Sequence, residues 1–341
     1  MEKLLSKILE ETLHLSAKGL VLTQLHGDAS NRIYYRLSLP QGQSFIVMQL
    51  PKGPASISEE ITTIKTKPKE LPFINITYFL KSQGLPVPQI HYEDLKEGLL
   101  LLEDFGDETF EKTVLKMDTE TQKSWYKKAI KLLVSFQSKG TQPDPHCIAF
   151  QRSFDQNLLD WEFEHFFEYG IEVRQNKKIP SKDREILKTE SQKITKILTG
   201  VPYILVHRDF QSRNLMIQND QLKLLDFQDA LMGPLPYDLV ALLRDSYIKL
   251  PWEIVSELVD YFVSLKKNID SKKFLKHFDL ITIQRKLKDT GRFVYIDRVK
   301  KNQNFLKHIP NSLAYVRSAL ERQFEFKDFF QILKKYVPEF H

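Results

Sequence analysis

Short apolar runs separated by turn-forming residues dominate the first hundred residues. The runs are rich in Val, Ile, Tyr and Phe, and stretches such as HGDASN and PQGQ break them, which predicts strands joined by turns. Helices are predicted at 1–16 and at 74–84, where Gly84 ends the second one, and a Pro-, Lys- and Ser-rich loop is predicted at 51–72. The predicted strands are 19–25, 32–39, 44–50, 88–94 and 98–104.

Beyond residue 104 apolar residues recur at helical spacing. One stretch of strand interrupts this pattern, because 203–206 leads into a polar loop and 215–217 can pair with 222–225 across the turn QNDQ. We therefore predict an α+β protein with the bilobal layout of protein kinases: a β-rich, nucleotide-binding lobe at 1–103 and a larger helical lobe at 104–341. The predicted helices are 119–138, 153–169, 182–198, 236–249, 252–267, 272–290 and 311–335.

The polar loop after the predicted strand reads HRDFQSRN at 207–214. His-Arg-Asp followed by four residues and Asn is the spacing of a kinase catalytic loop. In that chemistry Asp209 orients the attacking hydroxyl and takes its proton late, while Asn214 binds magnesium. Asp226, in LLDFQDA, supplies a second metal-binding oxygen, since metals that bridge phosphates need anionic ligands. The alternative is that Asp226 only caps a turn.

Composition narrows the class of protein further. The 341 residues are 42% hydrophobic and 28% charged, which is enough apolar chain for two cores. The single cysteine, Cys147, cannot form an internal disulfide, and we find no bilayer-spanning run and no signal peptide, so we expect a cytoplasmic protein without membrane contact. The net charge of +6 is spread along the chain among acidic residues, so we expect no nucleic-acid partner and no obligate protein partner.

Other parts of a phosphotransferase site are harder to locate. His207 is expected to pack beneath the loop, and Asp238, near the start of the apolar helix after GPLP, is expected to cap that helix or brace the loop. Kinases carry a lysine on their third strand that contacts the phosphates, but here that strand reads FIVMQ. The charge could come instead from Lys52, Arg32 or Arg36; otherwise phosphate binding relies on the metal and the backbone, or activity is low.

The segments LVHRDFQSRNLM, LKLLDFQDALMGPLPYDLVALLRD and QRKLKDTGRF, with LHGDASNRIYYRL near the start, resemble the aminoglycoside phosphotransferase superfamily. They are most similar to its bacterial branch of anomeric sugar kinases, which phosphorylate N-acetylmuramate and N-acetylglucosamine in cell-wall recycling. The similarity spans roughly residues 20–320, although MQLPK stands here where that branch has MDAPP. The resemblance implies ATP, Mg²⁺ and a small amino-sugar acceptor with a C1 hydroxyl.

Residue by residue, the resemblance implies a catalytic role for Asp209 and metal binding by Asn214 and Asp226. It also implies nucleotide contacts in the turn before the second strand and with the backbone at the hinge between the lobes. The residues expected to contact the nucleotide are Ser30, Asn31, Arg32, Glu103, Asp104 and Phe105. The residues considered for the acceptor are Glu162, Gln211, Arg213, Gln228, Asp229 and Arg244, each with loop bracing as its alternative role.

Two other functions stay open on the sequence. An aminoglycoside kinase needs an acidic cleft for its polycationic substrate, and the helical lobe is not notably acidic. A nucleotide-binding protein without transfer activity would account for the missing strand lysine, but it has no reason to keep the set Asp209, Asn214 and Asp226.

Overall fold

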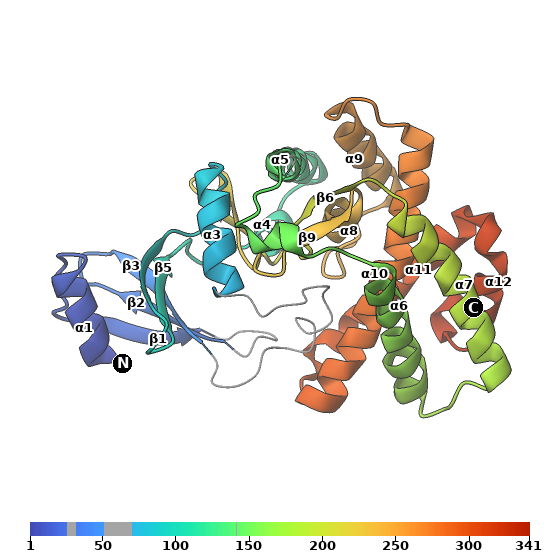
Figure 1. The fold of residues 1–341 in the computed structure, drawn as a ribbon, viewed down its shortest axis with the longest axis horizontal. Helices are drawn as coiled ribbons and strands as arrows, with labels where there is room; N and C mark the ends of the chain where they lie inside the picture. The colour runs from blue at the N-terminus through green and yellow to red at the C-terminus, as the bar shows by residue number, and fades with distance from the viewer. Residues whose placement is uncertain (26–31, 51–69, 141) are drawn as a thin grey trace.

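The computed structural model describes residues 1–25, 32–50, 70–140 and 142–341, so most of the loop predicted at 51–72 lies outside the described residues. Its N-terminal part is one antiparallel sheet in the order β1-β2-β3-β5-β4, flanked by helices α1 (Glu2–Glu11) and α3 (Pro72–Ser82) (Figure 1). The predicted strands and helices of this part are confirmed. The strands are β1 (Val21–Leu25), β2 (Ile33–Ser38), β3 (Ser44–Gln49), β4 (Ile90–Asp94) and β5 (Leu99–Glu103).

The alternation of side chains along the strands divides the sheet into two faces with different neighbours. Val47 and Leu101 point to the face that α1 covers, where they pack with Leu9. Met48 and Leu100 point to the opposite face and belong to a core that continues through α3 into the helical part. This second face is therefore the one turned toward the helices. The core that contains Met48 and Leu100 includes residues on both sides of the predicted lobe boundary at residues 103 and 104. The division into two lobes therefore stays a prediction.

Helices dominate the rest of the chain, as predicted, and α10 runs through their centre (Figure 1). Most of α10 is buried, and it packs against α6, α8, α11 and the π-helix η2. The elements are α4 (Phe110–Val114), α5 (Thr119–Lys139), η1 (Ile148–Gln151), α6 (Gln156–His165), η2 (Phe166–Val173), α7 (Ser181–Thr199), α8 (Tyr237–Leu243), α9 (Trp252–Ser264), α10 (Ser271–Lys300), η3 (Gln303–His308), α11 (Ile309–Arg322), η4 (Phe324–Phe326), α12 (Lys327–Lys334) and η5 (Pro338–Phe340).

Two small antiparallel pairs of strands hold the polar loop between them. The predicted hairpin is confirmed as β7 (Leu215–Gln218) and β8 (Gln221–Leu224), and β6 (Tyr203–Val206) pairs with β9 (Leu231–Pro234). The sequence did not predict β9, because LMGP is short and contains Gly and Pro. Gly233 is needed there, since a Cβ would lie 2.8 Å from the Phe154 ring and 2.9 Å from Val206.

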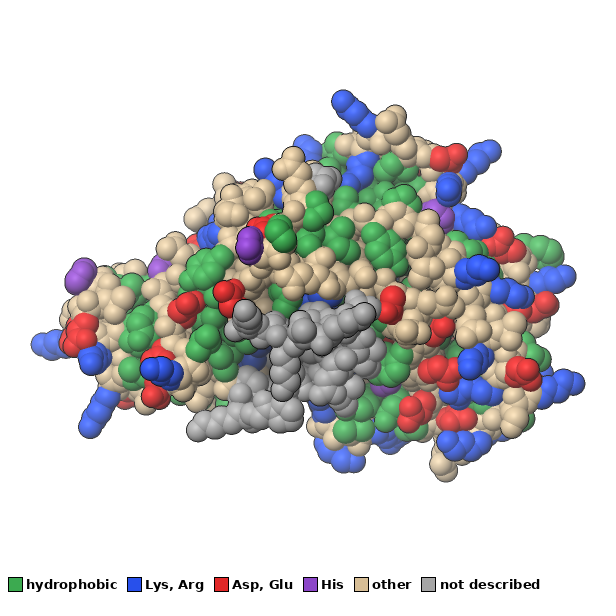
Figure 2. Space-filling model, viewed as in Figure 1, with side chains coloured by type: hydrophobic (Ala, Val, Ile, Leu, Met, Phe, Trp, Pro, Cys, Tyr) green, Lys and Arg blue, Asp and Glu red, His purple; other side chains and the backbone are tan. Residues whose placement is uncertain are grey.

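Several predicted helices differ in extent: the one predicted at 1–16 ends at Glu11, and the one predicted at 272–290 continues to Lys300. The one predicted at 236–249 ends at Leu243, the one at 153–169 changes into a π-helix at Phe166, and the one at 311–335 is two helices separated by η4. No helix among the described residues is long and apolar enough to cross a membrane. On the face shown in Figure 2, Lys and Arg side chains are interspersed with Asp and Glu, in agreement with their spread along the sequence.

Candidate active site

The loop that carries Asp209 is held by two buried carboxylates beneath it. Asp238 of α8 accepts hydrogen bonds from the backbone N–H groups of His207 (2.6 Å) and Arg208 (3.0 Å). Asp245 accepts one from the N–H of Ser212 (2.8 Å). These contacts stabilise an unfavourable backbone, because Arg208 has a φ of 75°. Asp238 thus lies where a loop brace was expected.

His207 is fully enclosed by the core. Its ring packs near Phe136 and Phe210, with 5.8 Å between ring centroids in each case. Burial lowers the pKa of His207 to about 4, although the charge of Asp209 opposes the shift. His207 is therefore neutral at physiological pH and lies beneath the loop, as expected of a structural residue.

Arg285 of α10 reaches the loop from a position 76 residues further along the chain. Its guanidinium donates to the Arg208 carbonyl (2.6 Å) and to Oδ1 of Asp209 (3.1 Å), and its own side chain is only 1% exposed. The protein around Asp209 raises the pKa of its carboxyl, but the charges of Arg285, Lys288 and Arg208 outweigh this and lower the pKa below its ordinary value. Asp209 is consequently ionised and fixed in orientation.

Asn214 and Asp226 meet at the mouth of this loop, as the motif spacing requires. The Asn214 amide donates to the Asp209 carbonyl (2.9 Å) and lies 3.5 Å from Oδ2 of Asp226. Asp226 adopts a φ of 61°, and the next residue, Phe227, stacks on Phe73 of α3 at 5.3 Å. The stacking fixes the turn that directs Asp226 toward Asn214.

The donor set suits a hard divalent cation. Asp226 is accessible to solvent, yet the protein crowded around it and the charge of Asp209 raise its pKa to about 6. A bound metal ion would neutralise the negative charge that Asp226 and Asp209 carry next to each other. Among the described residues no three His, Cys, Asp or Glu side chains form a metal cluster. One or two protein oxygens suffice for Mg²⁺, which completes its shell with phosphates and water.

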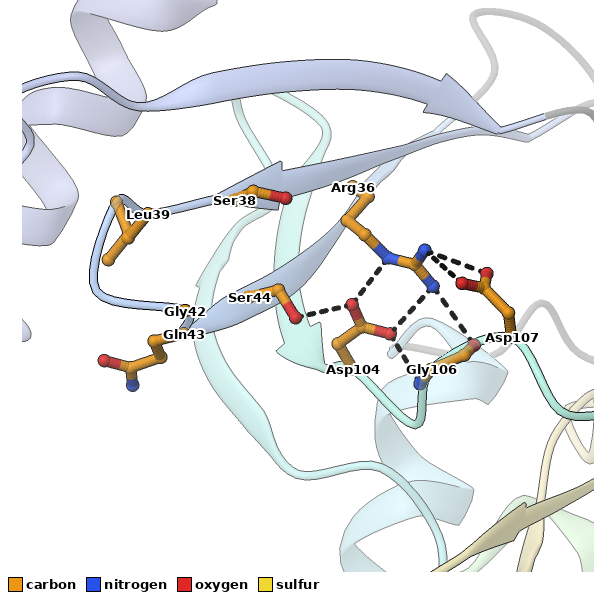
Figure 3. Close-up of a pocket in the computed structure, with 9 residues that line it drawn as sticks. All are labelled: Arg36, Ser38, Leu39, Gly42, Gln43, Ser44, Asp104, Gly106 and Asp107. Atoms are coloured by element: carbon orange, nitrogen blue, oxygen red, sulfur yellow. Dashed lines mark hydrogen bonds and ion pairs between the residues drawn. The ribbon is translucent and has the colours of Figure 1, made fainter.

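The hinge residues form a second charged network, at the end of β5 (Figure 3). The carboxylate of Asp104 accepts hydrogen bonds from Arg36 (2.7 Å), Ser44 (2.8 Å) and the Gly106 N–H (2.8 Å). A cavity of about 320 Å³ borders this network, and Asp107 pairs with Arg36 at its rim. Because the Asp104 carboxylate already accepts these hydrogen bonds, it stabilises the hinge and has little capacity left to bind a ligand.

The other hinge residues are also held by the protein. The Asp104 carbonyl accepts a hydrogen bond from Gln218 of β7 (3.2 Å), which ties the hinge to the helical part. The carboxylate of Glu103 accepts one from the Gln89 N–H (3.0 Å), and Phe105 is buried. A nucleotide contact at 103–105 would thus use backbone groups, as the resemblance implies.

The three candidates to replace the missing strand lysine have different surroundings in the structure. Arg36 is committed to Asp104 and Asp107. Arg32 lies near the metal ligands, because its charge opposes the rise in the pKa of Asp226 and of Tyr34. Lys52, together with Ser30 and Asn31, lies outside the described residues. Among the described candidates, Arg32 is therefore the one whose charge acts on Asp226.

The acceptor candidates near the loop mostly brace it. Glu162 is fully buried, accepts a hydrogen bond from Gln284 (2.6 Å) and lies 3.6 Å from the Arg208 guanidinium. Arg213 donates to Glu111 of α4 (2.8 Å). These three pairings join α4, α6 and α10 to the loop.

The residues after the metal ligand are held in a similar way. The Gln228 amide donates to Oδ1 of Asp226 (2.7 Å), and the Gln228 carbonyl accepts from buried Arg152 (2.7 Å). Asp229 lies 4.0 Å from the same guanidinium. Gln211 is half-buried within the loop.

Arg244, the remaining acceptor candidate, is buried among aromatic side chains. Its side chain is enclosed by the rings of Trp252 (4.7 Å), Tyr315 (5.0 Å) and Phe278 (6.0 Å), and only 2% of the residue is exposed. Burial lowers its pKa to about 10. These contacts are those of the bracing role that was the alternative for Arg244, whereas its contact with an acceptor stays a prediction.

Sequence reasoning missed Arg285 and its neighbours on α10. They stand in the segment QRKLKDTGRF, which resembled the family without suggesting a role for any one side chain. A usable signal was present, because Arg285, Lys288, Asp289 and Arg292 recur at spacings of three and four in a largely buried helix. Charges at such positions in a core helix require partners, and the catalytic loop provides them.

Comparison with known proteins adds to this geometry. Residues 21–262 match the model of the phosphotransferase enzyme family, APH. An N-acetylmuramate/N-acetylglucosamine kinase of Pseudomonas putida is 29% identical over 92% of this chain and 87% of its own. A kinase of the same name from Neisseria meningitidis serogroup B is 28% identical over 93% of this chain and 91% of its own. The predicted resemblance is confirmed.

The fold is shared with solved structures at much lower sequence identity. The ADP-bound aminoglycoside phosphotransferase APH(2'')-Ib superimposes with a TM-score of 0.60 at 15% identity, covering 91% of this chain and 97% of that chain. At this identity the similarity concerns the fold alone. The predicted α+β, kinase-like architecture is confirmed.

Proposed function

Because this chain belongs to the phosphotransferase enzyme family, we propose that it transfers the γ-phosphoryl group of ATP to the C1 hydroxyl of an N-acetylated amino sugar, N-acetylmuramate or N-acetylglucosamine. It is an enzyme that uses a nucleotide and a small-molecule acceptor. The observation that carries the proposal is the joining of Asp209, Asn214 and Asp226 around one point by a buried arginine and two buried carboxylates. A cell-wall recycling role follows from this choice of acceptor.

Asp209 would act on the acceptor hydroxyl. Arg285 holds Oδ1 of Asp209, so we assign Oδ2 to the hydroxyl that attacks the phosphorus. With its pKa lowered, Asp209 is a weak base, which suits a loose transition state in which the proton leaves the hydroxyl late. Its main contribution is to hold the hydroxyl oxygen in line with the bond that breaks.

Asn214 and Asp226 would hold Mg²⁺. When bound, the metal neutralises charge on the phosphate oxygens and on the leaving group. Asp226 must be ionised for this, and Gln228 keeps its Oδ1 in position. We assign Arg32 to the phosphates in place of the strand lysine.

The first experiment is ADP release with Mg²⁺, ATP and a panel of N-acetylmuramate, N-acetylglucosamine, glucosamine and an aminoglycoside. We expect turnover with an N-acetyl sugar and an acid-labile phosphate on C1. Asp209→Asn should lose about 100-fold or more of this activity yet keep ATP binding, because it removes the base and not a metal ligand.

Each other result points elsewhere. Turnover with the aminoglycoside alone would replace the proposed acceptor. ATP binding without turnover on any member of the panel would indicate a nucleotide-binding protein that does not transfer phosphate. Loss of ATP binding in Asp209→Asn would contradict the role assigned to Asp209.

A further inference from the structure

The face of α10 beside the catalytic loop carries two cations one helical turn apart. Lys288 is 18% exposed and pairs with Asp289 (3.1 Å), while Arg292 lies over the Tyr295 ring (5.0 Å). Both act electrostatically on the catalytic carboxylate, since the charge of Lys288 contributes to the low pKa of Asp209 and the charge of Asp209 acts on Arg292. Two cations therefore lie close to the group that would orient the acceptor.

Nearby carboxylates do not account for this positive charge. Asp289 is shared between Lys288, Lys286 (2.7 Å) and Arg285 (3.9 Å). Asp209 is already engaged by Arg285, and Glu162, whose charge also acts on Lys288, is engaged by Arg208 and Gln284. Cations gathered beside a reaction centre, with fewer anions among them, favour an anionic ligand. They disfavour a polycationic one.

Aromatic side chains stand next to the cations. The ring of Tyr169 in η2 meets Tyr295 of α10 edge-on at 5.2 Å, and His165 lies between Trp161 (5.3 Å) and Tyr169 (4.8 Å). Burial, and then the charges of Arg292 and Lys288, lowers the pKa of His165 to about 4, so this ring is neutral. Trp161, Tyr169 and Tyr295 are only half-buried, and rings with apolar faces and polar edges suit the C–H groups of a sugar.

A close contact between the backbone of α10 and the end of α6 brings the cations and the aromatic side chains together. A Cβ on Gly291 would lie 2.9 Å from the Phe166 Cα and 3.0 Å from the His165 carbonyl oxygen, so only glycine lets α10 approach this closely. The contact point is where α6 gives way to the π-helix η2. A π-helical turn inside a helix often marks a functional site. Figure 1 shows α6 alongside α10.

We propose that Lys288 and Arg292 bind a carboxylate of the acceptor, with Trp161, Tyr169 and Tyr295 lining the sugar ring. This inference rests on the proposed function and deepens it. Of the two sugars in question, N-acetylmuramate carries a carboxylate on its lactyl group and N-acetylglucosamine does not. The pair Lys288 and Arg292 thus sets the preference between them.

The test compares the two sugars on the same variants. Arg292→Gln and Lys288→Gln should each lower the ratio of kcat/KM for N-acetylmuramate to kcat/KM for N-acetylglucosamine by about tenfold or more, mainly through KM, because each removes a charge-assisted hydrogen bond. Arg292→Lys should restore part of the ratio. Lys272→Gln, an exposed lysine at the start of the same helix, is the matched control.

Three results would overturn the inference. An equal loss on both sugars would mean that the two cations only position the loop. A rise in KM for ATP in place of a change in the ratio would mean that they bind phosphate. An unchanged ratio would mean that no carboxylate contacts them. If the unaltered protein phosphorylates neither sugar, the proposed function itself fails, and this inference with it.

Discussion

Two arginine–aspartate pairs join distant parts of this chain, and they are built differently. Arg285 and Asp209 link the central helix to the catalytic loop, and the arginine side chain is 1% exposed. Arg36 and Asp104 link β2 to the hinge, and that arginine side chain is 21% exposed, with Asp107 beside it at the surface. The first pair orients the catalytic aspartate, whereas the second pair connects strand β2 to the hinge after β5.

The difference lies in what each aspartate has left when its arginine is removed. Asp104 keeps hydrogen bonds from Ser44 and the Gly106 N–H. Asp209 loses the contact that fixes Oδ1, and the Arg208 carbonyl loses its donor as well. The Asp209 side chain is 32% exposed and the Asp104 side chain 3% exposed, so the two pairs differ in the donors that remain and in the buried carbonyl that Arg285 would leave without a donor. The catalytic pair should therefore be the sensitive one.

Removing Arg285 should give the largest effect. We expect Arg285→Ala to lower the free energy of unfolding by about 3–5 kcal/mol, because it removes a buried guanidinium and leaves the Arg208 carbonyl and Asp209 without their donor. Urea unfolding measures this, and kcat measures the accompanying loss of transfer. Arg285→Lys keeps the charge but not the planar fork, and full activity in that variant would contradict the geometric role of Arg285.

The brace beneath the loop should come next. Asp238→Ala leaves the N–H groups of His207 and Arg208 without their acceptor in a buried position. We expect a loss of about 2–5 kcal/mol in the free energy of unfolding. Asp260→Ala, which removes an exposed carboxylate of α9, serves as the comparison and should cost far less. An equal loss of stability in both variants would contradict the bracing role of Asp238.

Metal binding should depend on pH through Asp226. Its pKa of about 6 means that the carboxylate is ionised above that pH and protonated below it. Because a cation must displace the proton, affinity for Mg²⁺ in the presence of ATP should be steady above pH 7 and fall by up to about tenfold per pH unit below pH 6. Titration at pH 5, 6 and 7.5 measures this. The dependence should vanish in Asp226→Asn, and its survival there would assign it to another group.

The hinge pair should give the smallest effect. Arg36→Gln removes a partly exposed ion pair whose aspartate keeps two other donors, so we expect about 1 kcal/mol of destabilisation and unchanged kcat. Thermal unfolding and turnover at saturating ATP measure the two quantities. A loss of activity as large as that of Arg285→Ala would erase the distinction between the two pairs and place Arg36 in the nucleotide site.

Much of this molecule was determined by local pattern in the sequence. Alternating apolar runs gave the sheet, helical spacing gave the helical part, and HRDFQSRN with LLDFQDA located Asp209, Asn214 and Asp226. Such features are predictable because strand, turn and loop chemistry act between residues close in the chain. Their roles in catalysis stay predictions until activity is measured.

Tertiary structure decided which charges serve the site. Arg285 lies 76 residues from Asp209, and no local pattern connects them. Arg244 has the same side chain but is surrounded by aromatic rings, and Arg36 is taken up by the hinge. The strand β9 exists only because β6 offers it a partner. A charged residue obtains its role from the neighbours that desolvate and pair it, and those neighbours come together only when the chain has folded.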